Sequence, residues 1–267
     1  MTGAAWRVGA AWRLGLLALV CLGLTPLQLL AIRRGWRLAG RLPVVFHRLF
    51  VRLFGLRVTV RGTPPAGRPT LVLANHVSWL DIPVLASLHP LSFIAKSEIA
   101  GWPIAGQLAR LQRSVFIERT RRGATAEVNH LVAARLAQGE AIVLFAEGTT
   151  GDGNRLLPFR SSLIGAARAA LAEPGPDGSP PAEVWLQPLS IAYTGRHGLP
   201  VTRRDRPEIA WYGDMDLGPH ALGFLSGGPL DVAVTWGEPI PFRVGDDRKA
   251  ATASAEAAVR RALRGGA

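Results

Sequence analysis

The spacing of hydrophobic residues along this chain changes near residue 55. Residues 14–32 form a run of 19 residues without a charged side chain, long enough to cross a hydrocarbon layer about 30 Å thick. Over residues 36–54, apolar side chains recur every three or four positions, which is typical of an amphipathic helix. After that segment, short apolar runs alternate with helical patterns to the end of the chain.

This alternation predicts an α/β domain. The strands are expected at 56–61, 70–74, 91–95, 114–118, 141–146, 183–192, 208–212 and 230–235. The helices are expected at 82–88, 101–111, 125–138, 161–172, 219–225 and 246–263. Such a pattern favours a single domain with a mostly parallel sheet flanked by helices. We therefore divide the chain into a membrane-anchoring helical segment, residues 1–54, and a domain, residues 55–267.

We interpret the apolar run as a retained anchor rather than a cleaved signal peptide, because no small-residue cleavage site follows it. Pro26 leaves open whether this helix spans the membrane or only enters it. In the next segment, arginines at 37, 41, 48 and 52 occupy a face away from the apolar side chains. Such a helix can lie in the interface of an anionic membrane, or pack on the domain as an ordinary surface helix.

Positive charge is concentrated in front of the predicted domain. The first 80 residues contain eleven arginines and no acidic residue, whereas the remaining 187 carry 20 Lys+Arg against 19 Asp+Glu. A basic arm could bind nucleic acid or an anionic membrane, and its apolar content favours the membrane. More arginines follow the apolar run than precede it, which favours a domain on the cytoplasmic side of a bacterial inner membrane. No nucleic-acid-binding motif is recognisable, so no nucleic acid is expected as a partner.

The candidate chemistry begins where the predicted strand at 70–74 ends. His76 and Asp81 follow this strand, five residues apart. Imidazole can take a proton from a hydroxyl, and a nearby carboxylate can fix its tautomer and stabilise the imidazolium. Taken alone, such a pair is usually incidental. The other histidines lack metal-ligand spacing and are interpreted as surface or core residues, and the single cysteine excludes a cysteine cluster, so no metal or other cofactor is expected.

Three further polar clusters fall at or beside the ends of predicted strands. In the first, Arg119 could bind a phosphate or carboxylate through its forked donors. In the second, Glu147 is followed by Gly148 and Thr149, a turn whose backbone N–H groups could face an anion or a developing oxyanion. In the third, Pro188 within a strand-like run suggests an edge or a bulge near a site.

Together these clusters resemble the 1-acylglycerol-3-phosphate acyltransferase family of bacterial phospholipid synthesis. The resemblance runs over residues 36–241 and comprises four blocks in order: Asn75-His76-x4-Asp81, Gly106 with Phe116-Ile117-Glu118-Arg119, Phe145-Ala146-Glu147-Gly148-Thr149, and Pro188. It implies a glycerolipid acyltransferase-like fold. It also implies an enzyme that moves a fatty acyl group from acyl-CoA or acyl-carrier protein to the hydroxyl of a lysolipid, without an acyl-enzyme.

The resemblance also implies roles for single residues. His76 would be the general base and Asp81 would orient it. The residues implied in substrate binding are Asn75, Arg119, Glu147, Gly148 and Thr149.

The chain departs from the family pattern at two positions. Ala146 stands where the family usually has proline, and Thr150 stands where it usually has an arginine thought to help bind the acceptor phosphate. The second departure leaves two acceptors open, lysophosphatidic acid and lyso-ornithine lipid. Residues 204–207 and 211–216 resemble lyso-ornithine lipid acyltransferases. An alternative from another class is a non-catalytic lipid-binding protein anchored by residues 1–54.

Overall fold

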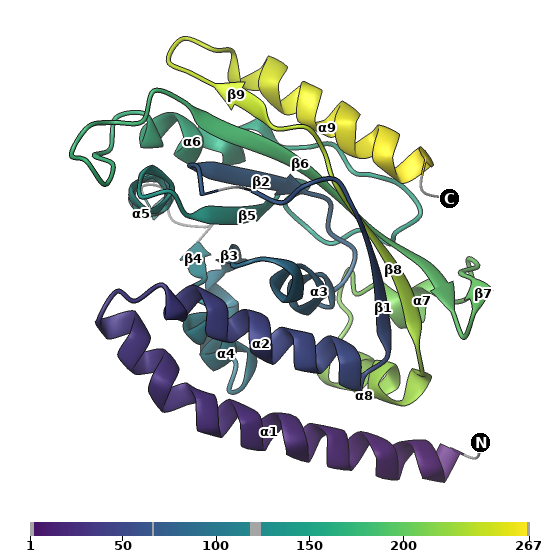
Figure 1. The fold of residues 1–267 in the computed structure, drawn as a ribbon. Helices are drawn as coiled ribbons and strands as arrows, with labels where there is room; N and C mark the ends of the chain where they lie inside the picture. Colours follow the sequence, from purple (N-terminus) through teal and green to yellow (C-terminus); the bar gives the residue numbers. More distant parts are fainter. Residues whose placement is uncertain (1–2, 66, 118–123, 266–267) are drawn as a thin grey trace.

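Figure 1 shows the protein as a computed structural model, which describes residues 3–65, 67–117 and 124–265. Its centre is a nine-stranded sheet, ordered β1-β8-β6-β2-β5-β3-β4, with β7 and β9 also paired to β6. Neighbours along this order are parallel, except that β6 runs antiparallel to β7, β8 and β9. The strands are β1 (Leu56–Arg61), β2 (Thr70–Ala74), β3 (Ser92–Lys96), β4 (Val115–Ile117), β5 (Ala141–Phe145), β6 (Val184–Arg196), β7 (Leu199–Pro200), β8 (Leu230–Trp236) and β9 (Ile240–Phe242).

Helices cover both faces of this sheet, which confirms the predicted α/β class (Figure 1). One face carries α2 (Leu38–Leu53), α3 (Asp81–Leu88), α4 (Ala105–Leu111) and α8 (Leu217–Gly227). The other carries α5 (Ala124–Ala137), α6 (Gly165–Ala170) and α9 (Arg248–Gly265). The short helical segments are η1 (Ser97–Gly101), η2 (Ser161–Ile164) and α7 (Arg206–Ile209).

Strand β2 shows how the sequence builds two cores. Val72 and Ala74 point into the core shared with α2, α3 and α8, whereas Leu71 and Leu73 point into the core shared with α5, α6 and α9. Successive side chains of a strand face opposite sides, so a strand covered on both faces must be apolar throughout. All five residues of β2 are buried.

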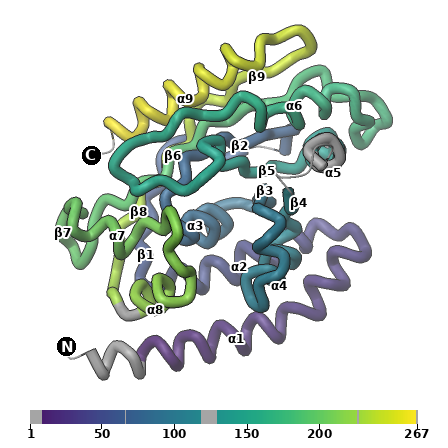
Figure 2. The backbone as a smooth tube through the Cα atoms, turned by 180° about the vertical axis from the view of Figure 1, so that it is seen from behind, coloured from purple at the N-terminus to yellow at the C-terminus, as the bar shows by residue number. Residues whose placement is uncertain are grey.

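The N-terminal helix α1 (Gly3–Arg33) lies outside the first helical layer, against α2, α4 and α8, as both views show (Figures 1 and 2). By length and composition, its segment Gly9–Arg33 is long and apolar enough to cross a membrane. The mean hydropathy is 2.1, and 17% of its most apolar 18-residue stretch is buried inside the protein. Leu19 and Leu22 are 69% and 71% exposed.

Helix α2 packs Phe46, Leu49 and Leu53 against the domain core. Its apolar face is therefore largely covered by the protein itself, as the surface-helix interpretation required.

Two expectations about local structure were wrong. Residues 208–212 form no strand: α7 occupies Arg206–Ile209, and Pro207 stands in its first turn, where a proline fits a helix. Pro188 is not at a sheet edge. It lies inside β6, paired with Leu73 of β2, at the point where β6 changes its antiparallel partner from β9 to β8. At this junction the missing proline N–H interrupts neither antiparallel ladder.

Candidate active site

The site forms where β2 and β5 end side by side. These strands are parallel and in register up to Ala74 and Phe145, and Ala146 N–H donates to the Ala74 carbonyl at 3.0 Å. Carboxyl ends of parallel strands meet at one edge of a sheet, so the two loops that follow begin next to each other. His76 lies in the first loop and Glu147 in the second. The pairing of β2 with β5 thus brings together two residues that are 71 positions apart in sequence.

Asp81 is fully buried and accepts hydrogen bonds on both carboxylate oxygens. Its Oδ2 accepts from His76 Nδ1 at 2.7 Å, from Val77 N–H at 2.8 Å and from Ser78 N–H at 3.0 Å. Its Oδ1 accepts from the Tyr193 hydroxyl at 2.7 Å. Since Asp81 opens α3, its charge also lies at the positive end of a helix. These contacts hold the carboxylate in one orientation against the imidazole.

The His76 ring is fixed on two sides. Asp81 accepts from Nδ1, and Phe145 stacks on the ring with centroids 3.7 Å apart and planes 11° from parallel. With its proton on Nδ1, the neutral imidazole has an unprotonated Nε2. The side chain remains 16% exposed. The structure therefore places His76 and Asp81 together as predicted, and Nε2 is the ring nitrogen that does not contact Asp81.

Glu147 connects the two loops. Its Oε1 accepts from His76 N–H at 2.7 Å, and its Oε2 accepts from Leu157 N–H at 2.8 Å. Burial raises the pKa of Glu147 to about 7, although the two N–H bonds act in the opposite direction. Gly151 N–H donates to the His76 carbonyl at 2.8 Å, which ties the second loop to the first again. In this geometry Glu147 positions the His76 backbone, and its contact with substrate stays a prediction.

The raised pKa of Glu147 predicts a pH-dependent stability. Between its ordinary pKa of 4.5 and the folded value of about 7, the folded chain binds the proton that the unfolded chain has released. The free energy of unfolding should therefore fall as pH rises through this window, and level off above it. Urea unfolding of the wild type and of Glu147→Gln at pH 5, 6, 7 and 8 measures this contribution. We expect the wild type to lose stability relative to the variant up to about pH 7, and a pH-independent difference would contradict the assignment.

Asn75 uses its amide to join two strands. Its Nδ2 donates to the Ile191 carbonyl at 2.9 Å and its Oδ1 accepts from Ile191 N–H at 2.8 Å. The side chain is buried, and these bonds fix the start of the His76 loop against β6. The predicted contact of Asn75 with substrate stays a prediction.

The turn after Glu147 departs from ordinary backbone geometry. Gly148 has a φ of +76°, a conformation that favours glycine. Thr149 is exposed next to it. Among the described backbone contacts, the N–H groups of Thr149 and Thr150 donate to no acceptor. Arg119 lies outside the described residues, so its predicted role is untouched by the structure.

Tyr193 is a site residue that the motifs did not single out. Burial, the Asp81 charge and the hydrogen bond to Asp81 raise its pKa well above its ordinary value, so the hydroxyl remains a donor. The available signal was a tyrosine in a buried strand, because a buried phenol requires a hydrogen-bond partner.

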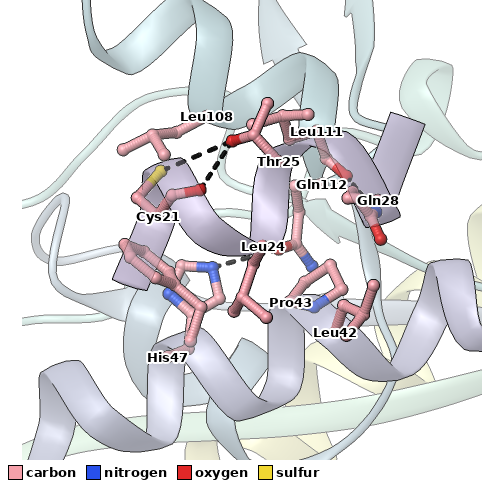
Figure 3. A pocket seen from close by; sticks show the side chains of 11 residues that line it. Cys21, Leu24, Thr25, Gln28, Leu42, Pro43, His47, Leu108, Leu111 and Gln112 are labelled. Carbon is pink, nitrogen blue, oxygen red and sulfur yellow. Dashed lines mark hydrogen bonds between the residues drawn. The ribbon is translucent and has the colours of Figure 1, made fainter. Parts of the chain in front are cut away.

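A pocket elsewhere, between α1, α2 and α4, does not include His76 (Figure 3). Cys21, Gln28, His47 and Gln112 are among its lining residues. Burial lowers the pKa of His47 to about 4, and its ring hydrogen-bonds to Gln112 Oε1 at 3.0 Å. His47 is therefore a neutral packing residue, as expected for the histidines other than His76. Among the described residues, no group of His, Cys, Asp or Glu could hold a metal ion.

Comparisons with known proteins identify the family of the chain. A family model described as Acyltransferase matches residues 56–192. The lyso-ornithine lipid O-acyltransferase of Brucella abortus is 48% identical over 91% of this chain and 89% of its own length. The enzyme of the same name from Rhizobium meliloti is 47% identical over 88% and 78%.

The fold is also that of a solved structure. The 1-acyl-sn-glycerophosphate acyltransferase PlsC from Thermotoga maritima is similar with a TM-score of 0.63, at 18% identity, over 99% of this chain and 98% of that one. By sequence and by fold, the chain belongs to the acyltransferase family.

Proposed function

We propose that this protein is a membrane-associated lysolipid O-acyltransferase that uses His76 as its general base. The observation that carries the proposal is the 2.7 Å contact between His76 Nδ1 and the buried Asp81 carboxylate. It fixes the tautomer that can accept a proton at Nε2. The names of the relatives supply the substrate class.

The reaction requires few chemical groups because a thioester is already activated. His76 Nε2 takes the proton of the lysolipid hydroxyl as its oxygen attacks the thioester carbonyl. The C–O bond forms, the C–S bond breaks, and the leaving sulfur recovers the proton from the imidazolium. Asp81 stabilises the imidazolium between these steps. We assign the developing oxyanion to the N–H groups of the turn at Thr149 and Thr150.

We propose lyso-ornithine lipid as the acceptor in preference to lysophosphatidic acid. Both highly similar relatives carry the former name, and Thr150 gives the site no charge where a phosphate-binding arginine would stand. The acyl donor is acyl-carrier protein or acyl-CoA. The test offers both lysolipids and both labelled donors to the purified protein in parallel and separates the products. Preferential acylation of lysophosphatidic acid would overturn the acceptor assignment.

We propose that α1 anchors the protein at an anionic membrane, which brings the site to its lipid substrate. In support, α1 exposes leucines along its length, and the arginines at 33, 34, 37 and 41 are exposed at its C-terminal end and beyond. Basic residues on this side of an apolar helix favour the cytoplasmic face, so we place residues 55–267 at the cytoplasmic face of a bacterial inner membrane.

Charges on the exposed face of α1 should release the protein from membranes. An aspartate costs about 2.5–3.5 kcal/mol at the centre of a membrane helix. We therefore expect the double variant Leu19→Asp, Leu22→Asp to lower the vesicle-bound fraction at least about tenfold. Flotation with anionic vesicles measures this fraction. The matched control, Leu131→Asp with Leu199→Asp, changes two leucines that are also exposed but lie outside α1, and should float like the wild type. Equal flotation of both double variants would contradict the anchor.

A further inference from the structure

Arg160 lies directly over the turn that follows Glu147. A Cβ built on Gly148 would come within 3.0 Å of Arg160 Cδ, 3.1 Å of Nε and 3.4 Å of Cζ. The glycine thus leaves the Arg160 side chain space that a Cβ would occupy. Gly148 directly follows Glu147, whose Oε1 accepts from the N–H of His76, the proposed general base. Arg160 therefore lies next to the turn that positions His76.

The base of the Arg160 side chain is held firmly. Arg160 N–H donates to the Ala146 carbonyl at 2.8 Å, and its own carbonyl accepts from Leu163 N–H at 3.0 Å. The preceding residue, Phe159, is buried and donates its N–H to Glu256 Oε2 at 2.9 Å. A side chain that starts from a fixed backbone can present its donors with little loss of conformational freedom.

The charge of Arg160 is not used within the described part of the protein. No carboxylate there forms an ion pair with it, and both oxygens of neighbouring Glu147 are occupied by the N–H groups of His76 and Leu157. Arg160 is exposed, so its guanidinium can meet a molecule that enters the site. Other arginines, such as Arg113, Arg135 and Arg196, are by contrast paired with glutamates.

We propose that Arg160 binds the carboxylate of the acceptor headgroup and so selects a carboxylate-bearing lysolipid; this inference rests on the proposed function. A guanidinium offers two parallel N–H donors that match the two oxygens of a carboxylate, and one positive charge that balances it. A phosphate monoester carries about −1.5 to −2 at neutral pH, more negative charge than the one guanidinium of Arg160 balances, and Thr150 beside it adds no positive charge. Arg160 is thus a specificity residue beside the Glu147 turn, with no part in the proton transfer.

The test combines a variant with a modified acceptor. The full chain in detergent micelles is assayed with lyso-ornithine lipid and with its carboxamide, which removes the negative charge of the carboxylate but keeps the hydroxyl. We expect Arg160→Gln to raise KM for the acid about 10- to 100-fold, the range for loss of a charged hydrogen-bonded pair. For the carboxamide, the KM of Arg160→Gln should be within about twofold of the KM that the wild type has for the same carboxamide. The KM for the acyl donor should be the same in both proteins. Arg160→Lys should lie in between, because it keeps the charge without the fork.

Arg155→Gln is the matched control, since it removes the same charge from an exposed position in the same loop. It should leave both acceptor KM values unchanged. The inference is overturned if Arg160→Gln alters the acid and the carboxamide equally, or alters neither. Equilibrium binding of the acid without donor separates this from the proposed function. If the wild type bound the acid through Arg160 but transferred no acyl group, the proposed acyltransferase activity would be refuted. The proposed carboxylate-binding site would stand.

Discussion

Replacing His76 with alanine is expected to lower the rate of acyl transfer at least about 100-fold, the lower end of general-base contributions. The hydroxyl of a lysolipid is a poor nucleophile until its proton is removed, and in the proposed mechanism His76 removes it, with its ring held by Asp81 and Phe145. The folded structure should persist, because the ring is partly exposed and Asp81 keeps three other donors. Initial rates with saturating donor and acceptor measure the loss.

His130→Ala is the control for this experiment. His130 is an exposed histidine on α5 that pairs with Glu173, away from the sheet edge that carries the site. It should transfer acyl groups at the wild-type rate, and both variants should keep their membrane association. A His76→Ala protein that acylates lysolipid as fast as the parent would remove the proposed mechanism.

Asp81→Asn should have the second large effect, on both rate and stability. Asparagine offers one acceptor oxygen and an NH₂ group, so at least one of the four donors around this position would face another donor. We expect a rate loss of about 10²–10⁴-fold, because asparagine no longer fixes the His76 proton on Nδ1 and no longer supplies a negative charge to the imidazolium. The buried unsatisfied donors should lower the free energy of unfolding by about 1–3 kcal/mol.

The two effects of this variant are measured separately, by initial rates under native conditions and by urea unfolding. Asp216→Asn removes an exposed carboxylate and serves as the charge control. If Asp81→Asn kept its rate within tenfold of the wild type while losing stability, Asp81 would be a structural residue and not a partner of the base.

Features with a local cause could be predicted from the sequence. The run at 70–74 became β2 because five consecutive apolar or β-branched residues suit a strand buried on both faces. His76 and Asp81 lie together as expected because one short loop separates them: His76 follows the end of β2, and Asp81 opens α3. The run at 14–32 lies within α1, since its length and composition alone favour a helix.

Features that depend on distant partners could not be predicted. Tyr193 reaches Asp81 across 112 residues of sequence, and the carboxylate of Glu147 turned inward to the His76 backbone. Pro188 is accommodated in a central strand because it lies between the part of β6 that pairs with β9 and the part that pairs with β8. The helix at Arg206–Ile209 replaced an expected strand because four residues carry too little periodicity to separate the two.

The central claim is direct transfer of an acyl group to a lipid hydroxyl, and tracing a labelled acyl thioester tests it most directly. With lyso-ornithine lipid present, the label is predicted to appear as an ester on the lipid. Without acceptor, it should remain on the donor, with none bound covalently to the protein. Direct acyl transfer would be contradicted if no donor lost its label while the lysolipid still bound, equally well in the wild type and in His76→Ala. That result would identify a lipid-binding protein in which the His76–Asp81 pair has no chemical role.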